Sequence, residues 1–574
     1  MDAYRDSSVP LDQRVEDLLG RMTLEEKAGL MFHPPILMNP DGTTLEEEAG
    51  FVGGGTTELI TQRHLNHFNI YFAPEPRQHA EWHNRLQEIA ASTRLGIPVT
   101  VSSDPRHSYE ENLGAAWSSE GFSRWPEPIG FGALRDVAAM EEFGDIARQE
   151  YRAVGVHVAL HPMADLATEP RWARIMHTFG EDGELAAAML GAYVRGFQGG
   201  ELGPHSVACM TKHFPGGGPQ RDGEDPHFEY GKDQIYPGGR FEYHVKVFEA
   251  AFAAGTAQIM PYYGRPVGTE LEEVGFGYNR DVITGLLRGR YGFNGVVCTD
   301  WALVSDTPMP DGSIWKAKAW GVEELSTEER VAKILDAGCD QLGGERLPEV
   351  VVSLVQSGRL TEERIDESAR RLLRDKFRLG LFDDPILDPG EAERICGNES
   401  FRAAGDRLQR RSAVVLTNGG VLPIPESSSV HLIGREEPVA IPDGADVVVV
   451  RRSTPFEPRN ANFIESVFHA GDLDFKEPEL SQLLDLARAV PTVLVLHLER
   501  PAVIPELAEA CAAVVAVFGA SDEAVLDVLH GRAKAEGKLP FELPSSMDAV
   551  RAQLEDVPSD SAEPLFPFGH GLEV

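Results

Sequence analysis

The first part of the chain alternates between apolar positions at helical spacing and short continuous apolar runs. Residues 11–32 place apolar side chains at helical spacing, and Thr23 with Glu26 form a capping-box pattern that predicts the start of a second helix. Downstream, amphipathic stretches separate short apolar runs, which lie at 97–103, 154–164, 206–214, 257–263 and 294–300. Short runs that alternate with helices in this way predict parallel β-strands buried on both faces.

This βα alternation predicts an α/β fold. The number of strands over residues 1–385 favours a (β/α)8-like TIM barrel over a three-layer open sheet. A barrel of this kind carries its active site at the carboxyl ends of its strands. Residues 1–385 are therefore the expected catalytic domain.

A second domain is expected after a break in the pattern. Residues 383–400 contain two Asp-Pro steps, many charges and no periodicity, which predicts a linker over 386–405. Residues 406–574 resume the alternation, with apolar runs at 412–417, 429–434, 445–452, 492–498 and 512–519. We expect these runs to form an open α/β sandwich.

Composition narrows the classes of function. The chain has 574 residues, too many for one hydrophobic core, and its net charge of −38 would repel nucleic acids and anionic membranes. A solvated acidic surface is the simpler explanation of the same charge. We therefore expect no nucleic-acid or membrane partner, and a homodimer is left open.

Neither a metal nor another cofactor is expected. The five cysteines are scattered singly, the histidines are dispersed, and KHFPGGGPQ lacks the Gly-Lys-Ser/Thr of a phosphate loop. The first residues show no basic segment followed by an apolar stretch, and no eighteen apolar residues run together. These patterns predict a cytoplasmic location, although a leader trimmed from the chain would leave the same sequence.

Polar residues follow the predicted strands at the points where the strands end. Asp104, Asp165, Lys212-His213 and Asp300 each come at or just after the end of an apolar run. Any one of them could be an ordinary polar residue at the start of a loop. Together they predict an active site at the carboxyl rim of the barrel.

Several segments resemble glycoside hydrolase family three, the exo-acting β-glucosidases and their relatives. The motifs are RVEDLLGRMTLEEKAGLM at the start, RLGIPV before Asp104, EPRWARIMHTFGED at 169–182, KHFPGGG at 212–218, LLRGRYGFNGVVCTDW at 286–301 and LFPFGHGL at 565–572. Their order and spacing agree with the family over nearly the whole chain. The resemblance implies the two-domain form, without a fibronectin-like third domain.

The resemblance implies a retaining mechanism, which needs a carboxylate nucleophile and a carboxylic acid on opposite sides of the glycosidic bond. Asp300 matches the family nucleophile, and the family's preceding Ser is Thr299 here. An Asp that caps the next helix is the structural alternative. The acid implied by the resemblance is Glu457, in the segment RRSTPFEPR of the second domain, where a solvated loop glutamate is the alternative.

A second candidate acid comes from the N-acetylglucosaminidase branch of the family. That branch uses an Asp-x-His dyad on the loop after KHFPG, and Asp225 and His227 are placed similarly here. A histidine held by an aspartate can donate a proton near neutral pH. The complete second domain and the RRSTPFEPR segment favour Glu457.

The resemblance also implies a set of side chains that hold the terminal sugar through several hydroxyls at once. These are Asp104, Asp165, Arg174, Lys212 and His213. Tyr263 and Trp301 would supply a hydroxyl and an apolar wall beside Asp300, with core packing as the alternative for both.

Three classes of function fit these residues. The first is a retaining exo-β-glycosidase, most simply a β-glucosidase that acts by double displacement on a small glycoside or short oligosaccharide. β-Xyloside and N-acetyl-β-glucosaminide are its alternative substrates. The second is a glycoside phosphorylase that uses the Asp-His dyad, because a carboxylate acid would repel phosphate. The third, a sugar-binding protein without catalysis, is disfavoured by the intact nucleophile motif.

Overall fold

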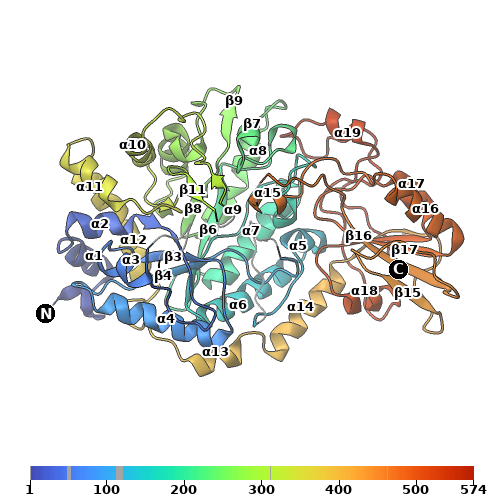
Figure 1. Ribbon diagram of the computed structural model, residues 1–574, viewed down its shortest axis with the longest axis horizontal. Coiled ribbons are helices and arrows are strands. Elements are labelled where there is room, and N and C mark those ends of the chain that lie inside the picture. The colour runs from blue at the N-terminus through green and yellow to red at the C-terminus, as the bar shows by residue number, and fades with distance from the viewer. Residues whose placement is uncertain (1, 48–53, 112–120, 310–311, 462, 574) are drawn as a thin grey trace.

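The computed structural model describes residues 2–47, 54–111, 121–309, 312–461 and 463–573 and folds into two domains (Figure 1). The larger one is built around a parallel sheet with the strand order β2-β3-β4-β5-β6-β8-β10. The strands of this domain's central sheet and closing pair are β1 (Phe32–His33), β2 (Pro35–Ile36), β3 (His67–Ile70), β4 (Thr100–Ser103), β5 (Val156–Ala159), β6 (Ala208–Phe214), β8 (Gln258–Pro261), β10 (Val296–Val297) and β13 (Leu342–Gly343).

Two parallel pairings close this sheet into a barrel. β1 pairs with β13, and a bridge between Cys298 and Gln341 joins the end of β10 to β13. With β1 and β2 counted as one strand interrupted at Pro34, the described strands make a ring of eight. The expected TIM-barrel architecture is confirmed.

Helices surround the barrel and follow most of its strands. The helices of this domain are α1 (Leu11–Leu19), α2 (Leu24–Leu30), α3 (Thr56–Thr61), α4 (Pro76–Ala91), α5 (Pro128–Leu134), α6 (Val137–Ala153), α7 (Gly183–Gln198), α8 (Phe241–Lys246), α9 (Phe248–Ala253), the π-helix η6 (Asp281–Arg290), α10 (Thr327–Ala337), α11 (Pro348–Gln356) and α12 (Glu362–Arg378). Two small ribbons lie outside the ring, β7 (Asp233–Ile235) with β9 (Arg265–Val267) and β11 (Thr307–Pro308) with β12 (Ile314–Trp315).

The opening helices form as the sequence predicted. The hydroxyl of Thr23 accepts a hydrogen bond from the backbone N–H of Glu26, and the Glu26 carboxylate accepts one from the Thr23 N–H. This capping box satisfies two backbone donors at the start of α2.

Three barrel strands were missing from the sequence prediction. β1/β2, β3 and β13 are only two to four residues long, and β3 (HFNI) mixes polar with apolar residues, so none of them stands out as an apolar run. They are strands because their neighbours in the barrel supply the hydrogen bonds.

The predicted linker at 386–405 is largely helical, which corrects its interpretation as an irregular segment. α13 (Pro389–Ile395) has a proline in its first turn, and its N-cap Asp388 accepts hydrogen bonds from the backbone N–H groups of Gly390 and Glu391. α14 (Glu399–Arg411) begins at Asn398, which caps the N–H of Phe401. The Asp388-Pro389 step therefore marks where a helix starts, whereas Asp384-Pro385 lies outside the helices. Both helices run along the lower edge of Figure 1 from one domain to the other.

The second domain is an α/β sandwich, as predicted. Its sheet has the order β14-β18-β17-β16-β15 and is parallel except for β14, which runs antiparallel to β18. The strands are β14 (Val414–Asn418), β15 (Val430–Ile433), β16 (Val447–Ser453), β17 (Thr492–His497) and β18 (Ala513–Val517), and the further helices are α15 (Phe463–Ser466), α16 (Glu479–Ala489), α17 (Pro505–Ala510), α18 (Asp522–Leu529) and α19 (Met547–Ala552).

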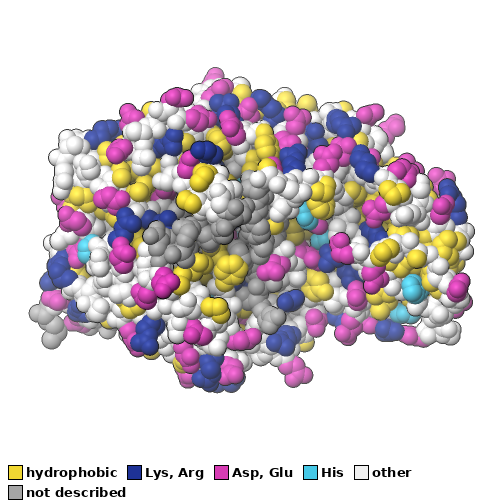
Figure 2. Space-filling model, in the orientation of Figure 1, with side chains coloured by type: hydrophobic (Ala, Val, Ile, Leu, Met, Phe, Trp, Pro, Cys, Tyr) yellow, Lys and Arg dark blue, Asp and Glu magenta, His cyan; other side chains and the backbone are white. Residues whose placement is uncertain are grey.

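Acidic and basic side chains are interspersed over the face of the molecule shown in Figure 2. No helix among the described residues is long and apolar enough to cross a membrane. The cytoplasmic location and the oligomeric state stay predictions.

Candidate active site

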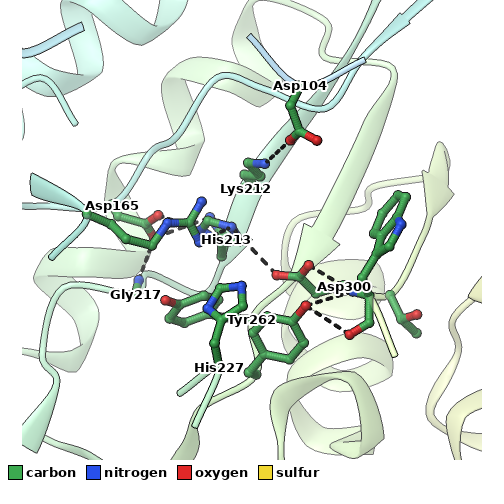
Figure 3. A network of polar contacts seen from close by, with 12 residues as sticks. Asp104, Asp165, Lys212, His213, Gly217, His227, Tyr262 and Asp300 are labelled. Atoms are coloured by element: carbon green, nitrogen blue, oxygen red, sulfur yellow. Dashed lines mark hydrogen bonds and ion pairs between the residues drawn. The ribbon is translucent and has the colours of Figure 1, made fainter. Parts of the chain in front are cut away.

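The carboxyl ends of β5, β6 and β10 bring three predicted site residues into one line. His213, in β6, lies between Asp165 and Asp300: its Nδ1 is 2.7 Å from Oδ2 of Asp165 and its Nε2 is 3.7 Å from Oδ2 of Asp300 (Figure 3). All three side chains are buried. Residues separated by up to 135 positions in the chain thus meet because parallel strands end at the same rim.

Asp165 is held as a fixed hydrogen-bond acceptor. Its Oδ1 accepts from the backbone N–H of Gly217 at 2.5 Å and from that of His213 at 3.2 Å. Burial nevertheless raises the pKa of Asp165 to about 6, against these hydrogen bonds. Gly217 belongs to the glycine-rich run after Lys212-His213, and it serves the site through its backbone N–H.

Arg174 assigns the tautomer of His213. An Nη1 of Arg174 lies 3.1 Å from Nε2 of His213, and since arginine is only a donor, this nitrogen accepts while Nδ1 donates to Asp165. Burial, and then the positive charge of Arg174, lowers the pKa of His213 well below its ordinary value. The imidazole is therefore neutral near neutral pH.

Lys212 and Asp104 form a second pair at the same rim. Nζ of Lys212 donates to Oδ1 of Asp104 at 3.2 Å, and Nδ2 of Asn69 lies 3.5 Å from the other oxygen of that carboxylate. Asn69 belongs to β3 and was not predicted as a site residue, because β3 itself was missed. Tyr71 follows the same strand, and its pKa is raised to a high value by burial, Asp104 and Asp300.

The nucleophile candidate has one bonded and one unbonded carboxylate oxygen. Oδ1 of Asp300 accepts from the backbone N–H of Trp301 at 2.8 Å. Oδ2 is buried without a hydrogen-bond partner among the described residues. The hydroxyl of Tyr263 donates to the carbonyl of Trp301 at 2.9 Å and accepts from its N–H at 2.9 Å, which fixes the peptide beside Asp300.

The alternative dyad is assembled on the loop after β6. Nδ1 of His227 lies 2.5 Å from Oδ1 of Asp225, whose other oxygen accepts from Trp172 at 2.9 Å and from Tyr262 at 3.1 Å. Burial alone would raise the pKa of Asp225, but the charge and hydrogen bonds of His227 and the charge of Arg174 together outweigh it, so the pKa is lowered. The ring of His227 is 4.6 Å from that of Tyr263 between centroids.

Glu457 lies on the exposed loop that follows β16. Its backbone N–H donates to the carbonyl of Ala470 at 2.9 Å, and its carboxylate lies beside Gly471. No described contact joins its carboxylate to Asp300. Its role as the acid therefore stays a prediction, and so do the sugar-binding roles of the other predicted residues.

Two arginines tie this loop of the second domain to the barrel. Arg500 is fully buried and donates to the carbonyls of Arg171 at 3.0 Å, Gly471 at 3.0 Å and Pro455 at 2.7 Å. Arg459 binds both carboxylate oxygens of Glu224 at 2.5 and 2.7 Å. The loop that carries Glu457 is thereby fixed to the barrel loop that carries His227.

Some residues of the site carried no signal in the sequence. The ring of Tyr262 packs against that of His213 at an angle of 39°, with centroids 4.4 Å apart. Lys318 lies buried on the loop after Asp300, and burial lowers its pKa well below the ordinary value against the opposing charge of Asp300. Tyr262 is next to a residue that was predicted, but Lys318 lies in a segment without periodicity. Position in the folded loop, and not any local pattern, brings it to the site.

The described ranges hold no group of three or more His, Cys, Asp or Glu side chains that could bind a metal ion. The arrangement instead offers a buried carboxylate with one oxygen unbonded by the described residues, the Lys212–Asp104 ion pair, and the hydrogen bond of Arg174 to His213. A group of this kind can bind a polyhydroxylated ring and attack one of its carbons.

Comparison with known families assigns both domains. Residues 56–374 match the model described as the N-terminal domain of glycosyl hydrolase family 3, and residues 436–574 match that of the family's C-terminal domain. The two matches fall on the barrel and on the sandwich.

Individual proteins agree along nearly the whole chain. "Probable beta-glucosidase C" of Aspergillus flavus is 49% identical over 99% of this chain and 91% of its own length, and "Periplasmic beta-glucosidase/beta-xylosidase" of Dickeya chrysanthemi is 41% identical over 100% and 91%. Among solved structures, a mutant exo-1,3/1,4-beta-glucanase from a Pseudoalteromonas species superposes with a TM-score of 0.79 at 22% identity, covering 99% of this chain and 96% of that one. A beta-glucosidase of Listeria innocua in complex with glucose gives 0.78 at 21% identity, covering 98% and 83%.

Proposed function

The chain belongs to glycosyl hydrolase family 3, and from this we propose that it is a retaining, exo-acting β-glucosidase. It removes a terminal non-reducing β-D-glucosyl residue from a small glycoside or short oligosaccharide. The observation that carries the proposal is the buried Oδ2 of Asp300, which has no hydrogen-bond partner among the described residues and lies at the end of a barrel strand.

Asp300 is the nucleophile in this proposal. Oδ2 attacks the anomeric carbon as the bond from that carbon to the leaving oxygen breaks, which gives a covalent glycosyl-enzyme. The Trp301 N–H, bound to Oδ1 at 2.8 Å, orients the carboxylate so that Oδ2 is the oxygen that reacts. Water then attacks the same carbon, and the carboxylate of Asp300 is restored.

Glu457 is the proposed acid and base. It gives its proton to the leaving oxygen in the first step and takes one from water in the second. In support, Arg500 fixes the loop on both sides of Glu457, because it binds the carbonyls of Pro455 and Gly471 as well as that of Arg171 in the barrel.

The hydrogen-bonded pairs at the rim are proposed to hold the sugar. Lys212 with Asp104, and Arg174 with His213, present donors and acceptors that match several hydroxyls at once. A sugar that lacks a matched hydroxyl leaves a buried charged group unpaired, and this penalty gives selectivity for the glucosyl residue.

β-Xylosides are a second substrate class. The Dickeya chrysanthemi relative carries both activities in its name, and a xyloside differs from a glucoside only by lacking the exocyclic hydroxymethyl group.

The test is release of nitrophenol from nitrophenyl β-glucoside, β-xyloside and N-acetyl-β-glucosaminide, with and without phosphate. The proposal expects phosphate-independent release that is fastest from the glucoside. Preference for the N-acetyl sugar, or a requirement for phosphate, would contradict it and return the acid role to Asp225 and His227.

A further inference from the structure

A cavity of about 300 Å³ lies at the opposite end of the barrel from Asp300. It is lined by residues 255–257 and 291–295, which lead into β8 and β10, and by the last turn of α12. Because β8 and β10 are parallel, their amino ends lie on the face of the barrel away from the rim that carries the catalytic candidates. The volume is at the lower end of the range for small-molecule sites.

Two guanidinium groups and no carboxylate line this cavity. Arg374 and Arg378 are one helical turn apart on α12, so they project from the same side of the helix. Among the described residues, Arg374 has one loose ion pair, 3.5 Å from its Nε to Oδ1 of the exposed Asp12, and Arg378 has neither an ion pair nor a hydrogen bond. In a chain with 91 Asp and Glu against 53 Lys and Arg, such a lining is a local site for an anion.

The neighbouring polar side chains support this charge pattern. Asp375 lies between the two arginines in the sequence, but it is buried, and its carboxylate accepts from Nε2 of Gln258 at 2.9 Å instead of lining the cavity. Asn294 does line it, and its Oδ1 accepts from Nε of Arg371 at 3.2 Å, which leaves the NH2 group as a further donor. The arginines and Asn294 therefore present N–H donors to a ligand.

Three aromatic rings form an apolar wall of the cavity. The ring of Phe252, in α9, lies 5.2 Å from that of Tyr291 and 5.8 Å from that of Phe293 between centroids. The guanidinium of Arg290 is 5.2 Å from the centroid of Tyr291, and that of Arg288 is 5.5 Å from the centroid of Phe293, which helps to hold both rings. All three rings are partly exposed, so a flat apolar ligand would displace water from them.

The two kinds of lining group select a ligand that has both kinds of surface. An inorganic anion would pair with the arginines and leave the rings in water. A neutral aromatic compound would cover the rings and leave the arginines unpaired. A carboxylate on an aromatic body satisfies both, because a planar guanidinium binds a carboxylate through two parallel hydrogen bonds.

We propose that this cavity binds a small aromatic carboxylate. Arg374 and Arg378 bind its carboxylate group. Its ring packs on Phe252, Tyr291 and Phe293. The inference goes beyond the proposed function, because the site lies at the other end of the barrel from Asp300 and its occupation requires no turnover.

The experiment measures binding of cinnamate to the full chain by isothermal titration calorimetry, with cinnamyl alcohol and acetate as the probes that lack the charge or the ring. We expect one cinnamate per chain with a Kd of about 1 mM or tighter. Cinnamyl alcohol and acetate should each bind at least about tenfold more weakly. Saturating glucose should leave the affinity for cinnamate unchanged.

Variants then locate the site. Arg374→Gln and Arg378→Gln should each weaken cinnamate binding at least about fivefold, and Phe293→Leu should weaken it about threefold. Arg394→Gln is the matched control, because it removes the same charge from an exposed arginine of α13, which packs against α4 and α6, and it should leave the affinity unchanged.

Several outcomes would overturn the inference. They are no saturation by cinnamate up to about 10 mM, equal affinity for cinnamyl alcohol or acetate, and unchanged affinity in both arginine variants. Competition between glucose and cinnamate would also overturn it, because it would place the carboxylate at the sugar site. The comparison of the three probes needs no variant and no activity, so its result is separate from that of the test of the proposed function.

Discussion

Nε2 of His213 lies 3.7 Å from Oδ2 of Asp300, on the side of that carboxylate that carries no hydrogen bond from a described residue. Because the one lone pair of this nitrogen already accepts from Arg174, the nitrogen carries no proton that it could donate to Asp300. His213 therefore does not hold Asp300 by a hydrogen bond, and it leaves the attacking oxygen free.

The first prediction concerns the tautomer of His213. The Asp165 carboxylate accepts hydrogen bonds from the Nδ1–H of His213 and from the N–H of Gly217. Asp165→Asn replaces it with a weaker acceptor, so the His213 ring can adopt the tautomer with its proton on Nε2. We expect kcat/KM for nitrophenyl β-glucoside to fall about 10- to 100-fold. Asp375→Asn is the matched control, since burial raises the pKa of Asp375 to about 6 as well, but this carboxylate binds Gln258 at the other end of β8. Equal losses in both variants would contradict the assignment.

The second prediction separates the two candidate acids. Glu457→Ala should slow substrates with poor leaving groups by about 100-fold or more, and should slow nitrophenyl glucoside less, because a good leaving group needs no proton. Added azide should restore turnover and yield glucosyl azide with retained configuration. Glu436→Ala, at another exposed loop position of the second domain, should behave as wild type. If His227→Ala shows this leaving-group pattern and Glu457→Ala does not, the dyad is the acid.

The third prediction tests whether Arg500 positions the loop of Glu457. Arg500→Met leaves three backbone carbonyls without their donor, and displacement of the loop should lower kcat/KM about tenfold or more, mostly for poor leaving groups. The double variant with Glu457→Ala should lose little more than Glu457→Ala alone. Arg488→Met, which breaks an exposed pair with Asp485 on α16, is the control. Full additivity, or equal losses for all leaving groups, would mean that Arg500 acts only on stability.

The fourth prediction is a dependence of stability on pH. Burial raises the pKa of Glu127 from an ordinary 4.5 to about 8, and its backbone N–H donates to the carbonyl of Phe518 across the domain boundary. Between these pH values the folded protein keeps a proton that the unfolded chain loses, so this group makes stability fall as the pH rises. Glu127→Gln retains an acceptor for the N–H of Glu110, and it should reduce the loss of stability as the pH rises. Thermal midpoints of both proteins from pH 5 to pH 8.5 check this, and parallel curves would contradict it.

The sequence predicts the fold and much of the site wherever a strand is part of a long apolar run. The runs that became β4, β5, β6, β8 and β10 predicted the barrel and placed Asp104, Asp165, His213 and Asp300 at one rim. β3 gave no signal because only its neighbours make it a strand, and Asn69 and Tyr71 were missed with it.

Long-range contacts explain the remaining differences. Phe468 meets His227 only after loops from distant parts of the chain have packed together. Segments without periodicity do not reveal such contacts. The sequence predicts a linker where the helices at 389–395 and 399–411 lie, because charges and prolines at the start of a helix also occur in irregular segments.

The most direct test of the account is to trap the glycosyl-enzyme. A deoxyfluoro-β-glucoside with a dinitrophenolate leaving group forms the intermediate but hydrolyses slowly, so mass spectrometry of the digested protein can locate the sugar. We expect one fluoroglucosyl group per chain, on the peptide that contains Thr299, Asp300 and Trp301, and none in Asp300→Ala. A label on another carboxylate, or an inactivated enzyme without any covalent label, would contradict the assignment of Asp300 as the nucleophile.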